Sequence, residues 1–274
     1  MPACPNQALA LIAETVTIDP GRCHFTGACV EACLPGALDL VGRRWTTEEV
    51  LDALERDRIY FDESGGGATI SGGDPFAQPD FLEALLLGCG EREIPVVVDT
   101  CGHVAPETFR RVIPLAQGVL FDLKLMDPGA HERFTGVDNR WILENLSWVA
   151  NGCRPEGGDS PGGSPDPSQG RGSGEHQRRS CPRLTVRLPL IPGINDEEES
   201  LRATAHFLLG LKHTPPVDLL PYHRLGVDKY RRMGRQYHLW KVASPDQNRV
   251  QGVVRILRDA GLEVTVRGEA HDHD

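Results

Sequence analysis

The sequence predicts an α/β protein whose parallel sheet is covered by helices on its outer face. Three observations support this prediction. Predicted strands and helices alternate along the chain, the strands are short and almost continuously apolar, and several strands end in a charged or glycine-rich loop. Apolar strands that alternate with helices are typical of parallel sheets, because their crossover helices bury them.

Composition restricts the classes of function. The chain has 274 residues, 39% hydrophobic and 25% charged, which fits one large domain or one domain with a small appendage. A formal net charge of −10 argues against nucleic acid as a partner, because phosphate binding needs a clustered positive surface and none is visible. No apolar run is long enough for a membrane span, and no leader pattern opens the chain. We expect a cytoplasmic protein.

The first 33 residues contain four of the eight cysteines, a density that favours a metal site over a disulfide framework. Residues 4–9 and 33–38 each consist of a cysteine, then a proline turn, then Ala-Leu. Ferredoxin-type cluster loops end in this way. Residues 23–33 match the pattern C-x2-C-x2-C-x3-C except for Thr26 at its second cysteine. We therefore predict a partial ferredoxin-type segment over residues 1–42, with the ligands Cys4, Cys23, Cys29 and Cys33. A loop-rich cap with structural cysteines is the alternative.

Residues 66–75 read GGATISGGDP, an apolar, β-branched run that stops at a tight loop. This pattern predicts a buried strand. Two adjacent glycines, Gly72 and Gly73, would let the backbone approach a small polar ligand, and Asp74 adds a charged acceptor. The alternative is an ordinary turn in which Asp74 caps a helix that begins at Pro75.

The other elements follow from local patterns. Residues 45–57 form a capped amphipathic helix, since apolar residues at helical spacing follow Thr-Thr-Glu-Glu. Further helices are expected at residues 79–91, 106–115, around 141–149, 197–211 and 246–260, and strands at 95–101, 119–124, 184–190, 217–220 and 262–266. Residues 154–182 are rich in Gly, Ser and Pro and are expected to be disordered. A disulfide between the flanking Cys153 and Cys181 is not expected in a reducing compartment.

Polar residues follow the predicted strands at the same end. Because parallel strands direct their carboxyl ends to one edge of the sheet, these residues are expected to gather at one rim. One such charge is typical of a solvated loop, but a succession of them indicates a functional site. The candidates are Gly72, Gly73, Asp74, Asp99, Asp122, Lys124, Arg187 and His223.

Five stretches, residues 71–81, 98–102, 121–124, 187–195 and 219–226, closely resemble the glycyl-radical-enzyme activating enzymes. These are radical S-adenosylmethionine (SAM) proteins typified by the pyruvate formate-lyase activator, here of the subtype with a two-cluster ferredoxin insert. The resemblance covers almost the whole chain apart from residues 154–182. It implies a partial (β/α) barrel of six strands, lacking its first strand in this chain, with SAM across the strand tops. Residues 43–153 and 183–274 would form the two parts of the barrel.

The resemblance also implies roles for the rim residues. Gly72, Gly73 and Asp74 match the Gly-Gly-Glu segment that holds the methionine amino group, although Asp74 is one methylene shorter than Glu. The polar positions around the methionine end and an associated cation are matched by Asp99, Asp122 and Lys124. The positions near the ribose and adenine are matched by Arg187 and His223.

One departure concerns the cluster that SAM chelates. Family members carry a C-x3-C-x2-C loop, and no such spacing occurs in this chain, so no catalytic residue is assigned. We expect an activase that lacks its N-terminal part and is inactive as given. The full-length form would use SAM and 4Fe-4S clusters to install a glycyl radical on a pyruvate formate-lyase-like partner, with a flavodoxin- or ferredoxin-like electron donor. The alternatives are a non-catalytic nucleoside- or partner-binding protein and, less well supported, a free-standing electron carrier.

Overall fold

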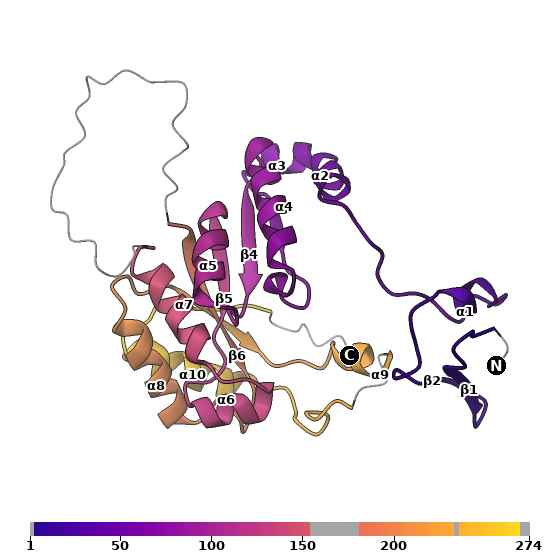
Figure 1. Ribbon diagram of the computed structural model, residues 1–274. Helices are drawn as coiled ribbons and strands as arrows, with labels where there is room; N and C mark the ends of the chain where they lie inside the picture. Colours follow the sequence, from indigo (N-terminus) through magenta and orange to yellow (C-terminus); the bar gives the residue numbers. More distant parts are fainter. Residues whose placement is uncertain (1–2, 154–180, 233–235, 269–274) are drawn as a thin grey trace, which may run out of the picture. The chain divides into compact units, whose positions relative to one another are not determined.

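The computed structural model describes residues 3–153, 181–232 and 236–268 (Figure 1). Most of the glycine-rich segment predicted at residues 154–182 therefore lies outside the described residues. The chain divides into two compact units, residues 1–49 and 50–274.

The N-terminal unit has little regular structure. Strands β1 (Leu9–Ile12) and β2 (Thr15–Ile18) form an antiparallel hairpin, and α1 (Ala28–Glu31) is a single turn. The two-residue turn of the hairpin, Ala13 and Glu14, has φ values of 46° and 64°, as tight hairpin turns require. Among the described residues of this unit, only Ala8 and Leu9 are buried apolar side chains. The unit therefore has almost no hydrophobic core.

The C-terminal unit is an α/β domain with one six-stranded sheet. Its strands are β3 (Ala68–Ile70), β4 (Val96–Thr100), β5 (Gly118–Asp122), β6 (Arg183–Leu190), β7 (Val217–Pro221) and β8 (Val264–Val266). Its helices are α2 (Thr47–Glu55, which begins just inside the first unit), α3 (Arg58–Ser64), α4 (Pro79–Glu91), α5 (Pro106–Val112), α6 (Pro128–Thr135), α7 (Arg140–Ala150), α8 (Glu198–Leu209), α9 (Val227–Arg232) and α10 (Gln247–Asp259). The 3₁₀ turns η1 (Pro75–Ala77) and η2 (Ile113–Leu115) complete it.

The sheet is parallel throughout, and its strands follow one another in chain order from β3 to β8. Alternate residues on each strand point to opposite faces. One set, which includes Val98, Phe121 and Val186, is buried in the hydrophobic core beneath the helices. The other set is only partly buried and includes Asp99 and Arg187. The parallel sheet covered by helices confirms the predicted fold class.

Local sequence explains most element boundaries. The predicted cap of α2 is a capping box, in which the Thr46 N–H donates to the Glu49 carboxylate at 2.7 Å and the Glu49 N–H donates to the Thr46 hydroxyl at 3.2 Å. Helix α4 has the predicted bounds. The helix predicted at residues 106–115 is instead α5 followed by η2, because Pro114 cannot continue an α-helix.

Two findings were not predicted. Helices α3 and α9 had no clear sequence signal, and the β1–β2 hairpin was not predicted although LALI and TVTI are short apolar or β-branched runs. Cys153 and Cys181 form a disulfide, which corrects the expectation of free thiols. The end of α7 and the start of β6 bring the two Cα atoms to 5.7 Å, within the usual range for a disulfide.

Within the described residues, no helix has both the length and the apolar character needed to cross a membrane.

Candidate functional site at the strand ends

A first polar cluster joins the ends of β3 and β4. The Asp74 carboxylate accepts hydrogen bonds from the Thr100 hydroxyl at 3.0 Å and the Cys101 N–H at 2.9 Å. It also accepts from the Phe76 N–H at 3.0 Å and caps η1, which begins at Pro75. The cap considered as an alternative in the sequence is therefore present. The same oxygens bind the loop after β3 to the tip of β4.

The two glycines before Asp74 leave the loop open. Gly72 has a φ of +134°, a conformation that favours glycine. A Cβ atom added at Gly72 or Gly73 would meet no described atom within 4 Å. The glycines are therefore not required for packing, and a ligand can approach their backbone.

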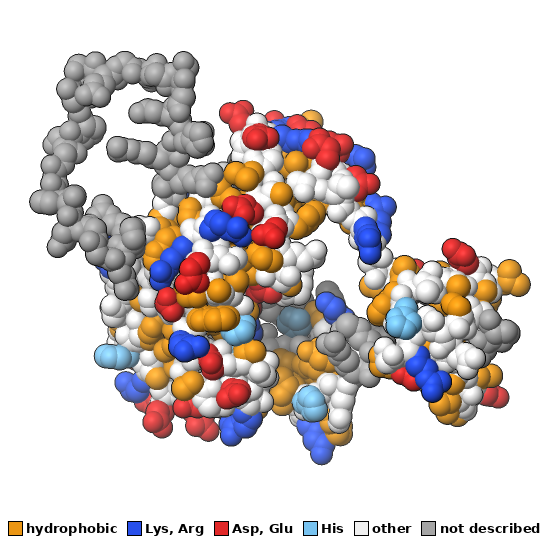
Figure 2. All heavy atoms as spheres, viewed as in Figure 1, with side chains coloured by type: hydrophobic (Ala, Val, Ile, Leu, Met, Phe, Trp, Pro, Cys, Tyr) orange, Lys and Arg blue, Asp and Glu red, His pale blue; other side chains and the backbone are white. Residues whose placement is uncertain are grey.

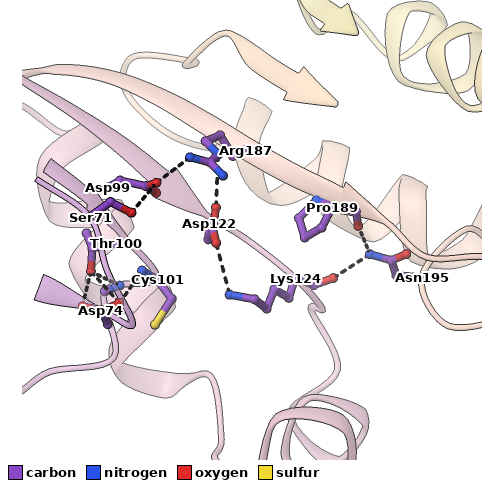
Figure 3. A network of polar contacts seen from close by, with 11 residues as sticks. Ser71, Asp74, Asp99, Thr100, Cys101, Asp122, Lys124, Arg187, Pro189 and Asn195 are labelled. Atoms are coloured by element: carbon purple, nitrogen blue, oxygen red, sulfur yellow. Dashed lines mark hydrogen bonds and ion pairs between the residues drawn. The ribbon is translucent and has the colours of Figure 1, made fainter. Parts of the chain in front are cut away.

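A second cluster of charged residues connects β4, β5 and β6 (Figure 3). Arg187 Nη1 lies 2.7 Å from Asp99 Oδ2, and Arg187 Nε lies 3.4 Å from Asp122 Oδ1. Lys124 Nζ lies 3.4 Å from Asp122 Oδ2. Ser71 joins the cluster from the loop after β3 by donating to Asp99 at 3.1 Å. The strand ends thus bring together four of the predicted charged residues.

The sheet register explains this convergence. Asp122 pairs directly with Arg187 across β5 and β6, so both side chains occupy the same face at the same level. Asp99 precedes the end of β4 by one residue and lies on that face too. Arg187 lies within β6 and not at its end, since β6 continues to Leu190. The rim is therefore defined by the end of β5.

Two buried polar atoms of the ion-pair cluster lack a hydrogen bond in the part of the chain that the structure describes. Burial raises the pKa of Asp122, while the neighbouring Lys124 and Arg187 oppose that rise. Asp122 Oδ1 and Arg187 Nε are buried and have no hydrogen-bond partner among the described residues, although they face each other at 3.4 Å. Buried polar atoms without partners are rare in proteins and call for an explanation. The two atoms partner each other as an ion pair whose geometry falls short of a hydrogen bond.

Two buried asparagines, which the sequence reading did not assign to the site, hold its loops in place. The side-chain amide of Asn195 donates to the carbonyls of Lys124 at 3.1 Å and Pro189 at 2.5 Å. The amide of Asn145 on α7 donates to the carbonyls of Gly102 and Val104, both at 2.9 Å. Asn195 fixes the backbone that carries Lys124, and Asn145 fixes the loop after β4.

Cys101 lies between the two clusters. Burial raises the pKa of its thiol to about 11, and the adjacent Asp74 carboxylate adds to the rise. The thiol is therefore protonated at neutral pH. This protonation disfavours a role as a nucleophile, because the thiolate is the reactive form.

His223 is at the same edge of the sheet but outside the ion-pair cluster. It follows β7 by two residues, and the Tyr222 N–H donates to the Leu190 carbonyl at 3.0 Å, which continues the pairing of β6 and β7. The His223 side chain is exposed. Its predicted place near the ribose and adenine of SAM stays a prediction.

The four N-terminal cysteines are free and half-buried. The Ala8 N–H lies 3.2 Å from Cys4 Sγ. Within the part of the chain that the structure describes, no three side chains of His, Cys, Asp or Glu gather in a metal-binding arrangement. The ligand set Cys4, Cys23, Cys29 and Cys33 stays a prediction, and no described residues form a site for the cluster that SAM chelates.

Two cavities lie elsewhere in the C-terminal unit. One, of about 370 Å³, is at the opposite end of the strands and is lined by Gly65, Gly66, Gly67, Gln117, Arg183 and neighbouring strand residues. The other, of about 530 Å³, lies between α7 and α8 and is lined by Met126, His206 and Phe207 among others. Neither contains a predicted site residue.

A parallel, helix-covered sheet with a polar rim at its carboxyl edge defines an α/β protein whose candidate site lies at the ends of its strands. Comparison with known proteins makes this assignment more specific. The chain is 31% identical to the indoleacetate decarboxylase activating enzyme of Tractidigestivibacter scatoligenes, over 96% of this chain and 78% of that protein. It is 35% identical to the isethionate sulfite-lyase activating enzyme of Oleidesulfovibrio alaskensis, over 85% of this chain and 67% of that protein. The chain therefore belongs to the glycyl-radical-enzyme activating enzymes, as the sequence motifs predicted.

Solved structures agree with this membership. A domain of the pyruvate-formate lyase-activating enzyme from Bacteroides vulgatus aligns with a TM-score of 0.53 and 30% identity, covering 74% of this chain and 99% of that domain. A radical SAM methyltransferase from Sphaerobacter thermophilus, 18% identical, aligns with a TM-score of 0.56 over 85% of this chain and 60% of that one, which supports the fold alone. No family model matches the chain. The cofactors of the family are SAM and 4Fe-4S clusters, and its partners are glycyl radical enzymes.

Proposed function

We propose that the rim binds SAM and that the 274-residue chain does not cleave it. The observation that supports binding is the ion-pair cluster at the strand ends, which gathers acidic and basic side chains beside an open glycine loop. A zwitterionic ligand suits this arrangement, because charge-assisted hydrogen bonds are stronger and more directional than neutral ones.

The proposed roles follow from charge. The loop formed by Gly72, Gly73 and Asp74 would hold the ammonium group of SAM. The loop backbone would contribute acceptors, because the Asp74 carboxylate already accepts hydrogen bonds from three groups of the protein. Lys124 would bind the carboxylate, and Asp99 and Asp122 would complete the surroundings of the methionine end. Arg187 and His223 would contact the nucleoside. Together these contacts would fix the orientation of the sulfonium.

A reduced four-iron cluster bound to SAM would supply one electron, which would split SAM into methionine and the 5′-deoxyadenosyl radical that takes hydrogen from a backbone glycine of the partner. The residues of this chain do not provide the three thiolates for that cluster, since C-x3-C-x2-C does not occur in it. We therefore assign binding and orientation to this chain, and no radical step. A pyruvate formate-lyase-like partner, a flavodoxin- or ferredoxin-like donor and a cytoplasmic location are part of the same proposal.

Calorimetric titration with SAM tests the rim. We expect saturable binding by the wild type and a Kd raised about tenfold or more by Lys124→Ala or Arg187→Lys, since each loses a charge-assisted contact of about 1.5–3 kcal/mol. Arg111→Ala is the control, because Arg111 is exposed and its ion pairs within the described residues are with Asp80 and Glu83 of α4. No binding by a folded wild type would contradict the proposal.

Cleavage is measured separately. Anaerobic reconstitution with iron and sulfide, reduction and incubation with SAM should give no 5′-deoxyadenosine. Its formation would show that this chain assembles a competent cluster and would contradict the predicted inactivity. Binding without cleavage is also the expected result for the alternative function, a non-catalytic binding protein of the same family.

A further inference from the structure

The segment between β7 and α10 differs in charge from the rest of the chain. Six of the 29 Lys and Arg residues fall within residues 222–242, against a single acidic residue, although the whole chain carries a charge of −10. This cluster corrects the expectation that no positive cluster is present. By contrast, basic and acidic side chains are interspersed over the helices of the face drawn in Figure 2.

The same segment also exposes large apolar side chains. Leu225 is 86% exposed, Trp240 58% and Tyr230 38%. Most exposed apolar side chains occur singly, whereas interfaces combine aromatic residues with arginine. We define the basic-aromatic surface by its described residues Arg224, Leu225, Lys229, Tyr230, Trp240 and Lys241.

Internal contacts hold this surface together. The Tyr222 and Tyr237 hydroxyls lie 2.7 Å apart, and the Tyr222 hydroxyl also donates to the Leu239 carbonyl at 3.3 Å. Arg224 donates from Nε and Nη2 to the Val242 carbonyl at 3.2 and 3.1 Å. These bonds tie the start of the segment to its end. The exposed side chains are therefore presented by a closed loop.

The loop leaves the sheet at the rim. It begins directly after β7, where the Tyr222 N–H bonds to Leu190 of β6, three residues beyond Arg187. A protein whose glycine is to reach a ligand at the rim must contact the surfaces that border the rim. The loop that carries the basic-aromatic surface begins at this edge.

We propose that the basic-aromatic surface is a docking surface for the glycyl radical enzyme, which it meets at an acidic patch with an apolar centre. This inference rests on the proposed function of the rim. Lys229, Lys241 and Arg224 would steer association with the acidic patch, because complementary charge mainly raises the association rate. Trp240, Leu225 and Tyr230 would supply the buried contact area.

Biosensor binding to three purified glycyl radical enzymes tests the proposal. The probes are pyruvate formate-lyase, indoleacetate decarboxylase and isethionate sulfite-lyase, at 50 and 200 mM NaCl. We expect at least one probe to bind, with an affinity that falls as salt rises. Lys229→Glu with Lys241→Glu should weaken that binding about tenfold or more, mainly through slower association. Trp240→Ser should weaken it mainly through faster dissociation.

The matched control is Lys212→Glu with Arg255→Glu, the same charge change at two exposed positions, before β7 and on α10. It should leave the Kd within about twofold. SAM titration of each variant reports the rim independently, so that loss of docking with intact SAM binding is distinct from failure of the rim proposal.

Three results would overturn the docking proposal. The first is an equal loss of enzyme affinity in the Glu variant and in the control. The second is that the wild type binds none of the three enzymes. The third is that the wild type, while binding no enzyme, binds a single-stranded RNA oligomer and the Glu variant does not.

Discussion

The carboxylate of Asp74 takes part in two structures at once, the cap of η1 and the bridge from β3 to the Thr100 hydroxyl and Cys101 amide. Thr100 is only 2% exposed. Removing a carboxylate that accepts from buried donors costs more free energy than the hydrogen bond itself contributes. The buried donors are then left with neither the carboxylate nor water as a partner. Asp74 therefore stabilises the rim even without a ligand.

Asp74→Ala should lower the free energy of unfolding by about 2–4 kcal/mol, the sum of a lost cap and unsatisfied buried donors. Urea denaturation measures this. Asp80→Ala is the control, because the Asp80 side chain is 92% exposed and its ion pair with Arg111 is worth little. Equal effects of the two substitutions would show that Asp74 is not structural.

The thiol of Cys101 allows a prediction about pH. Its folded pKa of about 11 lies above the ordinary value of 9.0, so the folded state binds this proton more tightly than the unfolded state. Its contribution to stability is complete below pH 9 and is lost as pH rises through 11. The rate of alkylation of Cys101 by iodoacetamide should be half-maximal near pH 11 in the folded protein and near pH 9 in urea. Peptide mapping measures both, and a folded-state rate that is half-maximal near pH 9 would disprove the shift.

At the residue scale, charged site residues could be predicted from the sequence and amide residues could not. Asp99, Asp122, Lys124 and Arg187 each interrupt or follow an apolar run, which makes them visible. Asn195 and Asn145 act on backbone carbonyls 71 and 43 residues away, and an uncharged amide leaves no local pattern. Their positions follow only from the packed structure.

At the scale of elements, the six strands of the parallel sheet were predictable because each is an apolar run bounded by turns or charges. Helix α4 was also predictable, since Pro79 starts it and its apolar positions repeat at helical spacing. Helix α3 buries none of its residues, and α9 has six residues within a basic segment. Neither has an apolar stripe, so periodicity could not reveal them.

The disulfide between Cys153 and Cys181 links the end of α7 to the start of β6. In the loop-closure model, a crosslink across 28 residues stabilises the fold by about 3.5 kcal/mol. Cys153→Ser with Cys181→Ser should lower the stability of the oxidised protein by up to about that amount, measured in urea. Dithiothreitol should lower the stability of the wild type by the same amount and leave the stability of the double variant unchanged. Alkylation of both residues in oxidised wild type without reductant would contradict the pairing.

At the scale of the whole molecule, the two units differ in what stabilises them. The C-terminal unit has an extensive apolar core, whereas the described N-terminal unit buries only Ala8 and Leu9. Segments of fewer than about 40–50 residues need a crosslink or a metal when they lack a core. The four N-terminal cysteines are the groups that could provide one.

Apart from cuts within residues 154–182, which are predicted to be disordered, limited proteolysis should therefore cut the N-terminal unit first. It should leave a resistant fragment that begins between residues 43 and 58. Anaerobic reconstitution with iron and sulfide should slow the cut, since metal binding stabilises the folded state. Cys23→Ala with Cys29→Ala is the control, and reconstitution should not slow its proteolysis. The same protection in this control would show that these cysteines are not the ligands.

Residues Cys153 and Cys181 also flank residues 154–180. Both lie near the start of β6, while the rim is defined by the end of β5, at the opposite edge of the same sheet. Sequence inserted between these cysteines enters and exits far from Asp99, Asp122 and Arg187. The position is accordingly suited to an affinity tag or fluorescent reporter, which would label the protein without obstructing the edge that ligands approach.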